Sequence, residues 1–495
     1  MSRNNSEMKL RVARTVKWNI IDKFLSMMLY TVTGIILARV LPNSDFGLIG
    51  AALVFSAFAN LFIDSGFSSA LIQKKHVSDL DYSSVLWFNI AMSIVIYVGL
   101  FLCAPFIAEL FQNDVRLIPV SRVIFLTFIF NATAIVQANR FVKEMNYSII
   151  TISNGISLFV SSVLAIWMAL TGFGVWALVW QSVMQSFMKS LCLWIGGKWV
   201  PLLKFSFTSI KSFSKVGFGM LGSSFLNTVF KNIYAFAIGN RAGVLSLSYY
   251  TQADKWSTMG ISSLSAIFTQ SFLPALSEYQ NDPTRFAAST AKMNRTISYL
   301  TFPFCGILIL TAAPIFHFLF GNKWDDSIYL FQLLIVRGLF TVLTTGYNNY
   351  IVALGKAKLI VYTEMIRDFT AFAALALTWS YIALERVDDL TYGIGIMLWG
   401  QIIASFISWL VTMVISSRLS FRTWWQFIMD SVPYLIITSI IVAVGSLLPY
   451  YIESAPALLL CQASSGAVIY LIINQILDSK VQKDVISYIF RRMRN

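Results

Sequence analysis

The sequence predicts an all-α polytopic membrane protein. Of its 495 residues 57% are hydrophobic and only 12% charged, and the mean hydropathy is +0.70. Such a composition excludes an ordinary soluble domain. Most of the apolar runs exceed the ~20 residues that a helix needs to cross a bilayer. We count about fourteen, at residues 16–38, 46–72, 83–111, 117–138, 147–171, 174–196, 213–238, 246–276, 296–320, 327–354, 359–383, 391–416, 427–448 and 456–477.

The basic residues predict how these runs are threaded. Of the 37 Lys and Arg residues, 25 lie in the tails and in every second gap, with Lys17 and Lys215 at the adjoining run ends counted among them; five lie in the other gaps, and seven lie deeper within runs. Because basic loops remain cytoplasmic, both termini are expected in the cytoplasm, and fourteen spans satisfy that parity. The first run carries Asp22 and Lys23 and is too long for a signal peptide, so it is expected to be a permanent helix. The net charge of +14 thus reflects topology and contact with membrane lipids, and no nucleic-acid partner is needed.

The sequence offers no chemistry typical of an enzyme. The polar stretches are each shorter than about 20 residues, too short for an extramembrane domain. There is no GxxxxGK[ST] phosphate loop. The two His residues, His76 and His317, and the four separate Cys residues lack metal-ligand spacing. We therefore expect a protein that is not an enzyme, with no metal and no cofactor.

Two similar segments indicate an internal duplication. Residues 34–48 and 236–250 each join an apolar helix to a basic residue, a turn of small residues and a second helix. A repeat of six spans starts and ends on one side of the membrane, so two copies would be related by an axis along the membrane normal. The expected architecture is two pseudo-symmetric six-helix bundles, residues 1–207 and 208–418. Helices 13 and 14 and a basic cytoplasmic tail follow in residues 419–495.

Polar residues recur at helical spacing within several runs. Stripes of Ser and Thr alone are explained by helix packing. Charged residues in the same stripes are not, because packing does not require them. The notable pairs, one for each of four runs, are Asn60 with Asp64, Asn227 with Lys231, Lys255 with Thr258, and Arg337 with Thr341.

The charges inside runs are the best candidates for function. Each costs ~2.5–3.5 kcal/mol at mid-membrane and needs a partner or water. For Lys23, Lys189 and the set Glu364, Arg367 and Asp368, snorkelling or a local ion pair near the interface explains the charge as well as a functional role does. A water-filled cavity is the favoured explanation for Asp64, Lys231, Lys255 and Arg337.

An excess of cations suits an anionic substrate. Lys provides a mobile point charge, and Arg provides a fork for two phosphate oxygens, so a phosphate or diphosphate head group is expected. Asp64, the deepest isolated acid, is a candidate to exchange a proton or Na⁺. The predicted site has substrate-binding cations Lys231, Lys255, Arg337, Lys23, Arg122 and Arg367; ion-coupling acids Asp64, Asp254, Glu364 and Asp368; and polar lining residues Asn60, Asn227, Thr258 and Thr341.

Several segments in the first 150 residues carry a family resemblance. LARVLPNSDFGLIG, FIDSGFSSALIQKK with its Asp64, DYSSVLWFN and APFIAELF resemble the Wzx-type polysaccharide exporters, the colanic-acid-exporter-like branch of the MOP flippase superfamily. The resemblance implies a fourteen-helix, two-lobed MOP/MATE-like protein of the bacterial inner membrane. It implies alternating access driven by a proton or sodium gradient. Cavity cations would hold the substrate, roles that fall here to Lys231, Lys255 and Arg337, with Asp64 for the ion.

The expected function is a flippase. It would translocate a polyprenyl-diphosphate-linked oligosaccharide repeat unit for O-antigen, capsule or exopolysaccharide assembly, with polysaccharide polymerase or assembly proteins as further partners. One alternative is a MATE-type multidrug or cation antiporter, which would fit an acid-dominated cavity better. A second is an integral membrane polysaccharide polymerase or glycosyltransferase, which would need a sizeable outer loop, and the outer loops here are short.

Overall fold

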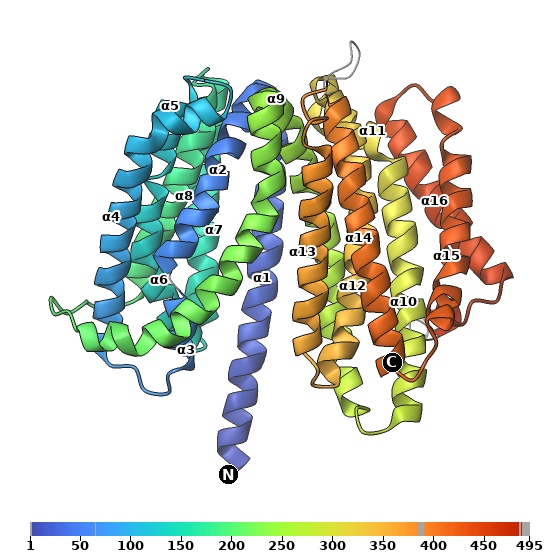
Figure 1. The fold of residues 1–495 in the computed structure, drawn as a ribbon, viewed down its shortest axis with the longest axis horizontal. Coiled ribbons are helices and arrows are strands. Elements are labelled where there is room, and N and C mark those ends of the chain that lie inside the picture. Colours follow the sequence, from blue (N-terminus) through green and yellow to red (C-terminus); the bar gives the residue numbers. More distant parts are fainter. Residues whose placement is uncertain (1, 65, 385–390, 485–486, 488–495) are drawn as a thin grey trace. The chain divides into compact units, whose positions relative to one another are not determined.

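The protein is helical throughout the part that the structure describes. A computed structural model describes residues 2–64, 66–384, 391–484 and 487, with the side chains of 2–13, 215–218, 220 and 223 excluded, and these residues contain no strand (Figure 1). The helices are α1 Ser2–Val40, α2 Asn43–Asp64, α3 Phe67–Gln73, α4 Asp79–Leu110, α5 Leu117–Ile124, α6 Thr127–Lys143, α7 Tyr147–Leu170, α8 Val175–Gly196, α9 Phe207–Glu278, α10 Pro283–Leu310, α11 Ala312–Phe320, α12 Asp325–Ala353, α13 Lys358–Thr378, α14 Tyr392–Leu419, α15 Trp424–Gly445 and α16 Ala455–Ile476.

Judged by length and hydropathy, fewer helices of the structure can span a membrane than the fourteen predicted from the sequence. Within the described residues, ten helices qualify, or eleven if α10 and α11, which meet at a 58° bend, form one span. All fourteen predicted runs coincide with helices, but the count of fourteen is not confirmed. Two of the runs share the continuous α9. Two more lie on α8 and α13, which do not qualify: α8 contains Gln181, Gln185 and Lys189, and α13 contains Glu364, Arg367 and Asp368.

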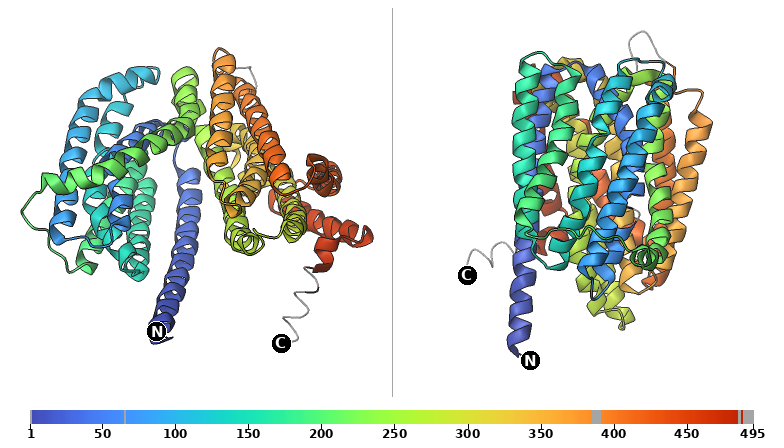
Figure 2. Two further views of the ribbon diagram at one scale, coloured as in Figure 1. Left: turned by 60° about the horizontal axis from the view of Figure 1, so that its bottom comes forward. Right: turned by 90° about the vertical axis from the view of Figure 1, so that its left-hand side faces the viewer.

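The chain divides into two compact units, Met1–Ser248 and Tyr249–Asn495. In the first, α7 packs on α1 and α8, α6 packs on α4 and α8, and α2 contacts α4, α5, α6 and α8. The view of this unit in Figure 2 (right) shows these long helices running nearly parallel. The first half of α9 belongs to the same unit, since its Phe225 ring contacts Phe58 and Phe62 and its Phe236 ring contacts Phe111.

The second unit is organised around α10 and α12. Helix α12 packs on α10 and α14, α13 packs on α14, and α10 packs on α15 and α16. Leu276, from the second half of α9, joins Phe286, Tyr347, Tyr350 and Phe427 in a buried core. The unit boundary at 248/249 therefore differs from the predicted lobe boundary at 207/208, because the first half of α9 packs with the first unit. The predicted six-helix repeat remains a prediction.

A glycine interrupts α9 near that boundary. Gly243 has φ 81° and ψ 176°, a backbone conformation that residues other than glycine rarely adopt. An added Cβ would lie 2.5 Å from Oε1 of Gln112, whose Nε2 donates to the Arg241 carbonyl. A Cβ on Gly47 would lie 1.7 Å from the Val244 carbonyl oxygen. The break is therefore held by close backbone packing within the first unit.

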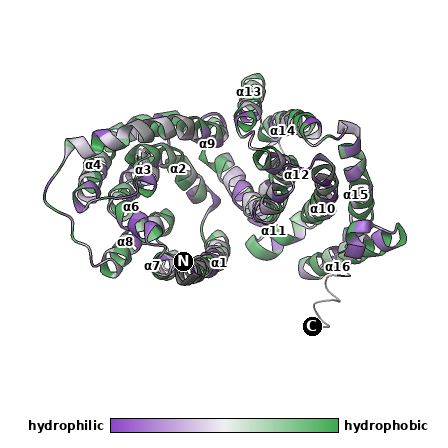
Figure 3. Cartoon of the chain, turned by 90° about the horizontal axis from the view of Figure 1, so that it is seen from below, coloured by the Kyte–Doolittle hydropathy of each residue, from purple (hydrophilic) through white to green (hydrophobic). Residues whose placement is uncertain are grey.

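Large apolar side chains cover much of the exposed surface of both units. Leu102 on α4, Leu377 on α13 and Leu460 on α16 are each about 70% exposed or more (69%, 78% and 70%). Figure 3 shows hydrophobic colouring on helices of both units. Apolar exposure on this scale is unfavourable in water and is expected where helices face lipid. The chain is a multi-span membrane protein.

Candidate substrate-binding site

Arg337 and Asp254 form the centre of the predicted site in the second unit. Arg337 on α12 donates from Nη2 to Asp254 Oδ1 at 3.1 Å and from Nη1 to Gln401 Oε1 at 3.2 Å, so residues of α9, α12 and α14 meet here. The side chains are only partly buried, with 22% of Arg337 and 36% of Asp254 exposed. A predicted cation and a predicted acid are thus joined, and the pair fixes the guanidinium in an accessible position.

Lys255 is a second exposed cation of this unit. It follows Asp254 on α9 and is exposed, with its Nζ 5.4 Å from the centre of the Trp256 ring. Among the described residues no carboxylate lies within ion-pair distance of it. Thr258 and Thr341, one turn further along α9 and α12, are also exposed. An exposed polar face inside a span is unfavourable toward lipid, so it is suited to water or a polar ligand.

Lys231 and Asn227 form a comparable face in the first unit. Both are exposed, four residues apart on the first half of α9. Lys231 has no carboxylate within 4 Å in the part of the chain that the structure describes. The sequence-predicted stripe is therefore present as a surface of one helix. Its cation is available to an anionic ligand.

Asp64 lies at the break between α2 and α3. Its Oδ1 accepts hydrogen bonds from the Ser68 hydroxyl and from the Ser68 backbone N–H, the latter at 3.3 Å. The Ser68 hydroxyl in turn accepts from Asn139 Nδ2 at 2.7 Å. One turn earlier, Asn60 Oδ1 accepts from Asn131 at 3.4 Å. Asp64 therefore ends a polar chain inside the first unit, and it also caps the turn into α3.

The remaining predicted charges have local partners or none. Arg122 donates to the Phe101 carbonyl at 3.3 Å and lies 4.4 Å from the centre of the Phe101 ring. Arg367 pairs with its neighbour Asp368 at 2.8 Å, while Glu364 is exposed and outside that pair. Lys23 on α1 is exposed, next to Asp22, which accepts a hydrogen bond from Asn154 at 3.1 Å. None of these residues is brought to the Arg337 pair by a contact among the described side chains.

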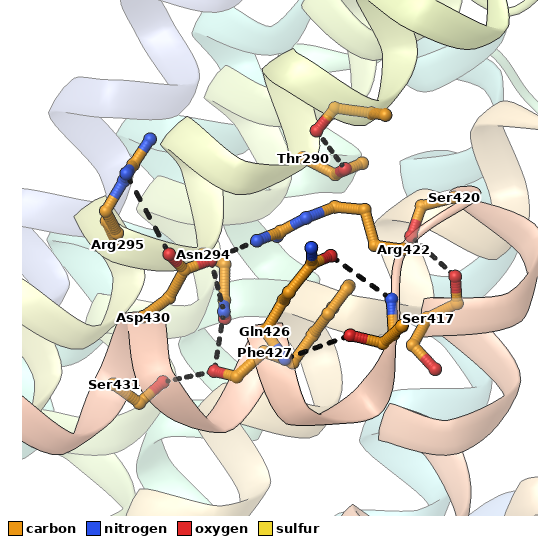
Figure 4. Close-up of polar contacts among 12 residues, drawn as sticks. Thr290, Asn294, Arg295, Ser417, Ser420, Arg422, Gln426, Phe427, Asp430 and Ser431 are labelled. Carbon is orange, nitrogen blue, oxygen red and sulfur yellow. Dashed lines mark hydrogen bonds and ion pairs between the residues drawn. The ribbon is translucent and has the colours of Figure 1, made fainter.

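A buried charged cluster was not predicted. Asp430 on α15 accepts from Arg422 Nη2 at 2.7 Å and from Asn294 Nδ2 at 3.4 Å, and Arg295 lies 3.9 Å away (Figure 4). Arg422 and Asp430 are 10% and 12% exposed. Asn294 also receives a hydrogen bond from the Tyr347 hydroxyl at 3.1 Å. The signal in the sequence was present, because Asp430 is the one acid in the run at 427–448.

The helical membrane fold of this chain is shared with solved structures of MOP-superfamily transporters. The chain resembles the solved structure of the lipid II flippase MurJ in its inward closed conformation, with a TM-score of 0.75, 15% identity, and coverage of 95% of this chain and 100% of that one. It also resembles an inward-facing MATE multidrug resistance transporter of the MOP superfamily, with a TM-score of 0.59, 17% identity, and coverage of 81% and 98%. Identities this low establish the fold alone.

Sequence relatives identify the family. Residues 36–329, more than half of the chain, match the family described as "Polysaccharide biosynthesis protein", and the chain belongs to that family. It is 26% identical to the teichuronic acid biosynthesis protein TuaB of Bacillus subtilis, over 92% of this chain and 93% of TuaB. It is 25% identical to the succinoglycan biosynthesis transport protein ExoT of Rhizobium meliloti, over 74% of each. It is 23% identical to the lipopolysaccharide biosynthesis protein WzxC of Escherichia coli, over 73% and 74%. The resemblance to Wzx-type exporters is thus confirmed.

Proposed function

We propose that this protein is a polysaccharide flippase of the bacterial inner membrane. It translocates a polyprenyl-diphosphate-linked oligosaccharide repeat unit from the cytoplasmic to the outer leaflet by alternating access, with both termini in the cytoplasm. The observation that carries the proposal is the partly exposed Arg337–Asp254 pair together with the exposed Lys255, the residue after Asp254, on helices that otherwise cross hydrocarbon. The family and its named relatives in polysaccharide transport support the class of substrate.

The chemistry of the pair fits a diphosphate. Asp254 and Gln401 hold the guanidinium of Arg337, so its planar fork is oriented before a ligand arrives. Lys255 brings a flexible charge that no carboxylate among the described residues neutralises. Lys231 provides a similar charge in the first unit. Cations of this kind disfavour the cationic substrate of a multidrug antiporter.

We also propose that Asp64 couples transport to a proton or sodium gradient. Its carboxylate is half-buried and ends the hydrogen-bonded chain through Ser68 to Asn139. A carboxylate that gains or loses such donors between conformations changes its affinity for a cation. This role requires no cofactor.

The test is export in a strain that lacks the native flippase, together with leaflet access in proteoliposomes. Lys255→Ala, Lys231→Ala and Arg337→Ala are each expected to reduce export at least about tenfold, the scale of one charge-assisted contact to phosphate. Lys356→Ala, an exposed lysine of the α12–α13 connection, is the matched control and should export normally. Membrane abundance is measured for every variant.

Normal export by all three cation variants would refute the assigned residues. If reconstituted wild-type protein fails to expose lipid-linked saccharides to an outer-leaflet probe, the flippase proposal itself is wrong.

A further inference from the structure

A pocket with four cations lies at one end of the second unit, away from the Arg337 pair. Its volume is about 410 Å³, and it is formed by α10 and by the short helical segment 480–484 that follows α16. Lys292 and Arg295 line it from α10, and Lys480, Lys483 and Asp484 line it from the segment. Four cations thus face one carboxylate.

The wall of this pocket is fixed by buried side chains. Gln482 is 5% exposed, donates to the Leu471 carbonyl at 3.0 Å and to Gln475 Oε1 at 3.2 Å, and accepts from the Tyr299 hydroxyl at 3.4 Å. Val481 is equally buried. The segment is therefore folded back onto α10 and α16, so its lysines are held in a defined place.

The ion pairs around the pocket leave positive charge in excess. Lys292 pairs with Asp484 at 2.8 Å, and Lys483 pairs with Asp478, which lies outside the pocket. Arg295 shares Asp430 with Arg422. Lys480 is exposed and has no carboxylate within 4 Å among the described residues. An anion would complete the charge balance.

Tryptophans indicate the depth of the pocket in the membrane. Asn294, next to the pocket on α10, donates to the Phe427 carbonyl in the first turn of α15. That turn begins with Trp424 and Trp425, which are 51% and 53% exposed. Exposed Trp pairs at helix ends are typical of the head-group region. Further along α10, Leu300 is 40% exposed, which is expected of an apolar side chain that faces lipid acyl chains.

We infer that this pocket binds the phosphate of an anionic phospholipid of the cytoplasmic leaflet. The four cations and the fixed wall recognise the phosphate, and the flanking apolar surface favours a lipid over a free anion. This site is distinct from the proposed export residues. Its occupant would tie α10 to the segment after α16.

The test is native mass spectrometry of the full-length protein with added lipid. Phosphatidylglycerol is expected to be retained more tightly than phosphatidylcholine. Lys292→Gln with Lys480→Gln should weaken phosphatidylglycerol binding about fivefold for each lysine. Both lysines are exposed, so the variant is expected to fold. Lys356→Gln with Lys358→Gln, which removes the same charge from the α12–α13 connection and the first residue of α13, both exposed, should bind as the wild type does.

Three results would overturn the inference. These are an equal loss of binding in the control pair, no preference for phosphatidylglycerol, and full competition by millimolar inorganic phosphate, which would indicate a free-anion site. None of them bears on export, because the variants leave Lys231, Lys255 and Arg337 in place.

Discussion

The second unit contains two Arg–Asp pairs that differ in surroundings. Arg422 and Asp430 lie 2.7 Å apart, nearly buried, with Asn294 and Arg295 as further partners of the carboxylate. Arg337 and Asp254 lie 3.1 Å apart and are two to three times more exposed. The first pair is nearly buried, whereas the second is partly exposed, and its Asp254 is followed in the chain by the exposed Lys255. The same two side chains thus form a nearly buried pair in one place and, in our proposal, part of a binding surface in the other.

The largest effect is expected from Asp430→Ala. Removal of this carboxylate leaves Arg422 as a buried, uncompensated charge, which typically costs about 3–5 kcal/mol of unfolding free energy. Thermal unfolding of the purified protein in detergent should show a markedly lower Tm, and export should fall together with membrane abundance. Asp430→Asn keeps a hydrogen-bond acceptor, so its Tm should lie between those of the wild type and Asp430→Ala. If the Tm of Asp430→Ala equals that of the wild type, the Arg422–Asp430 pair is not the structural pair described above.

Asp254→Ala is expected to have a smaller effect on stability and a distinct one on transport. A partly exposed pair contributes about 1 kcal/mol or less, so the Tm should change little. Export should still fall about tenfold, because Arg337 loses the partner that orients it. Asp254→Asn retains a hydrogen-bond acceptor and should recover part of the activity. If Asp254→Ala destabilises the protein as much as Asp430→Ala, both pairs are structural.

The smallest effect on stability is expected from Asp64→Asn. The amide oxygen can still accept from Ser68, so folding should be nearly unchanged. Transport, however, should become indifferent to collapse of the proton or sodium gradient. Ser68→Ala is the companion variant, since it removes the hydroxyl partner while leaving the carboxylate. Wild-type gradient dependence in Asp64→Asn would exclude this acid from coupling.

The sequence predicts the helices and the polar faces better than the pairs. Lys255, Thr258 and Thr341 are exposed and Arg337 is partly exposed, whereas the predicted water-filled cavity stays a prediction. The helical spacing does not reveal that Asp254 contacts Arg337, because the two residues are 83 positions apart in the chain and lie on different helices.

The buried cluster shows why the rest was not predictable in the same way. Arg422 counted as a loop cation, and Asp430 stood near the start of an apolar run. What joins them is the capping box of Thr423 and Gln426, which starts α15 between the two residues. In α13, the spacing predicted one set of Glu364, Arg367 and Asp368, whereas the ion pair joins only the adjacent Arg367 and Asp368. Local rotamers, which the spacing does not encode, decide such choices.

The glycine break in α9 has a consequence for genetic screens. Neither glycine is among the proposed export residues, yet a methyl group on Gly47 would overlap the Val244 carbonyl, and Gly243 has a positive φ that other residues rarely adopt. Random mutagenesis that selects for lost export should therefore recover substitutions at these glycines as readily as substitutions of the cations. Only the amount of protein in the membrane would separate the two classes, since the glycine variants fail in assembly and the cation variants fail in transport.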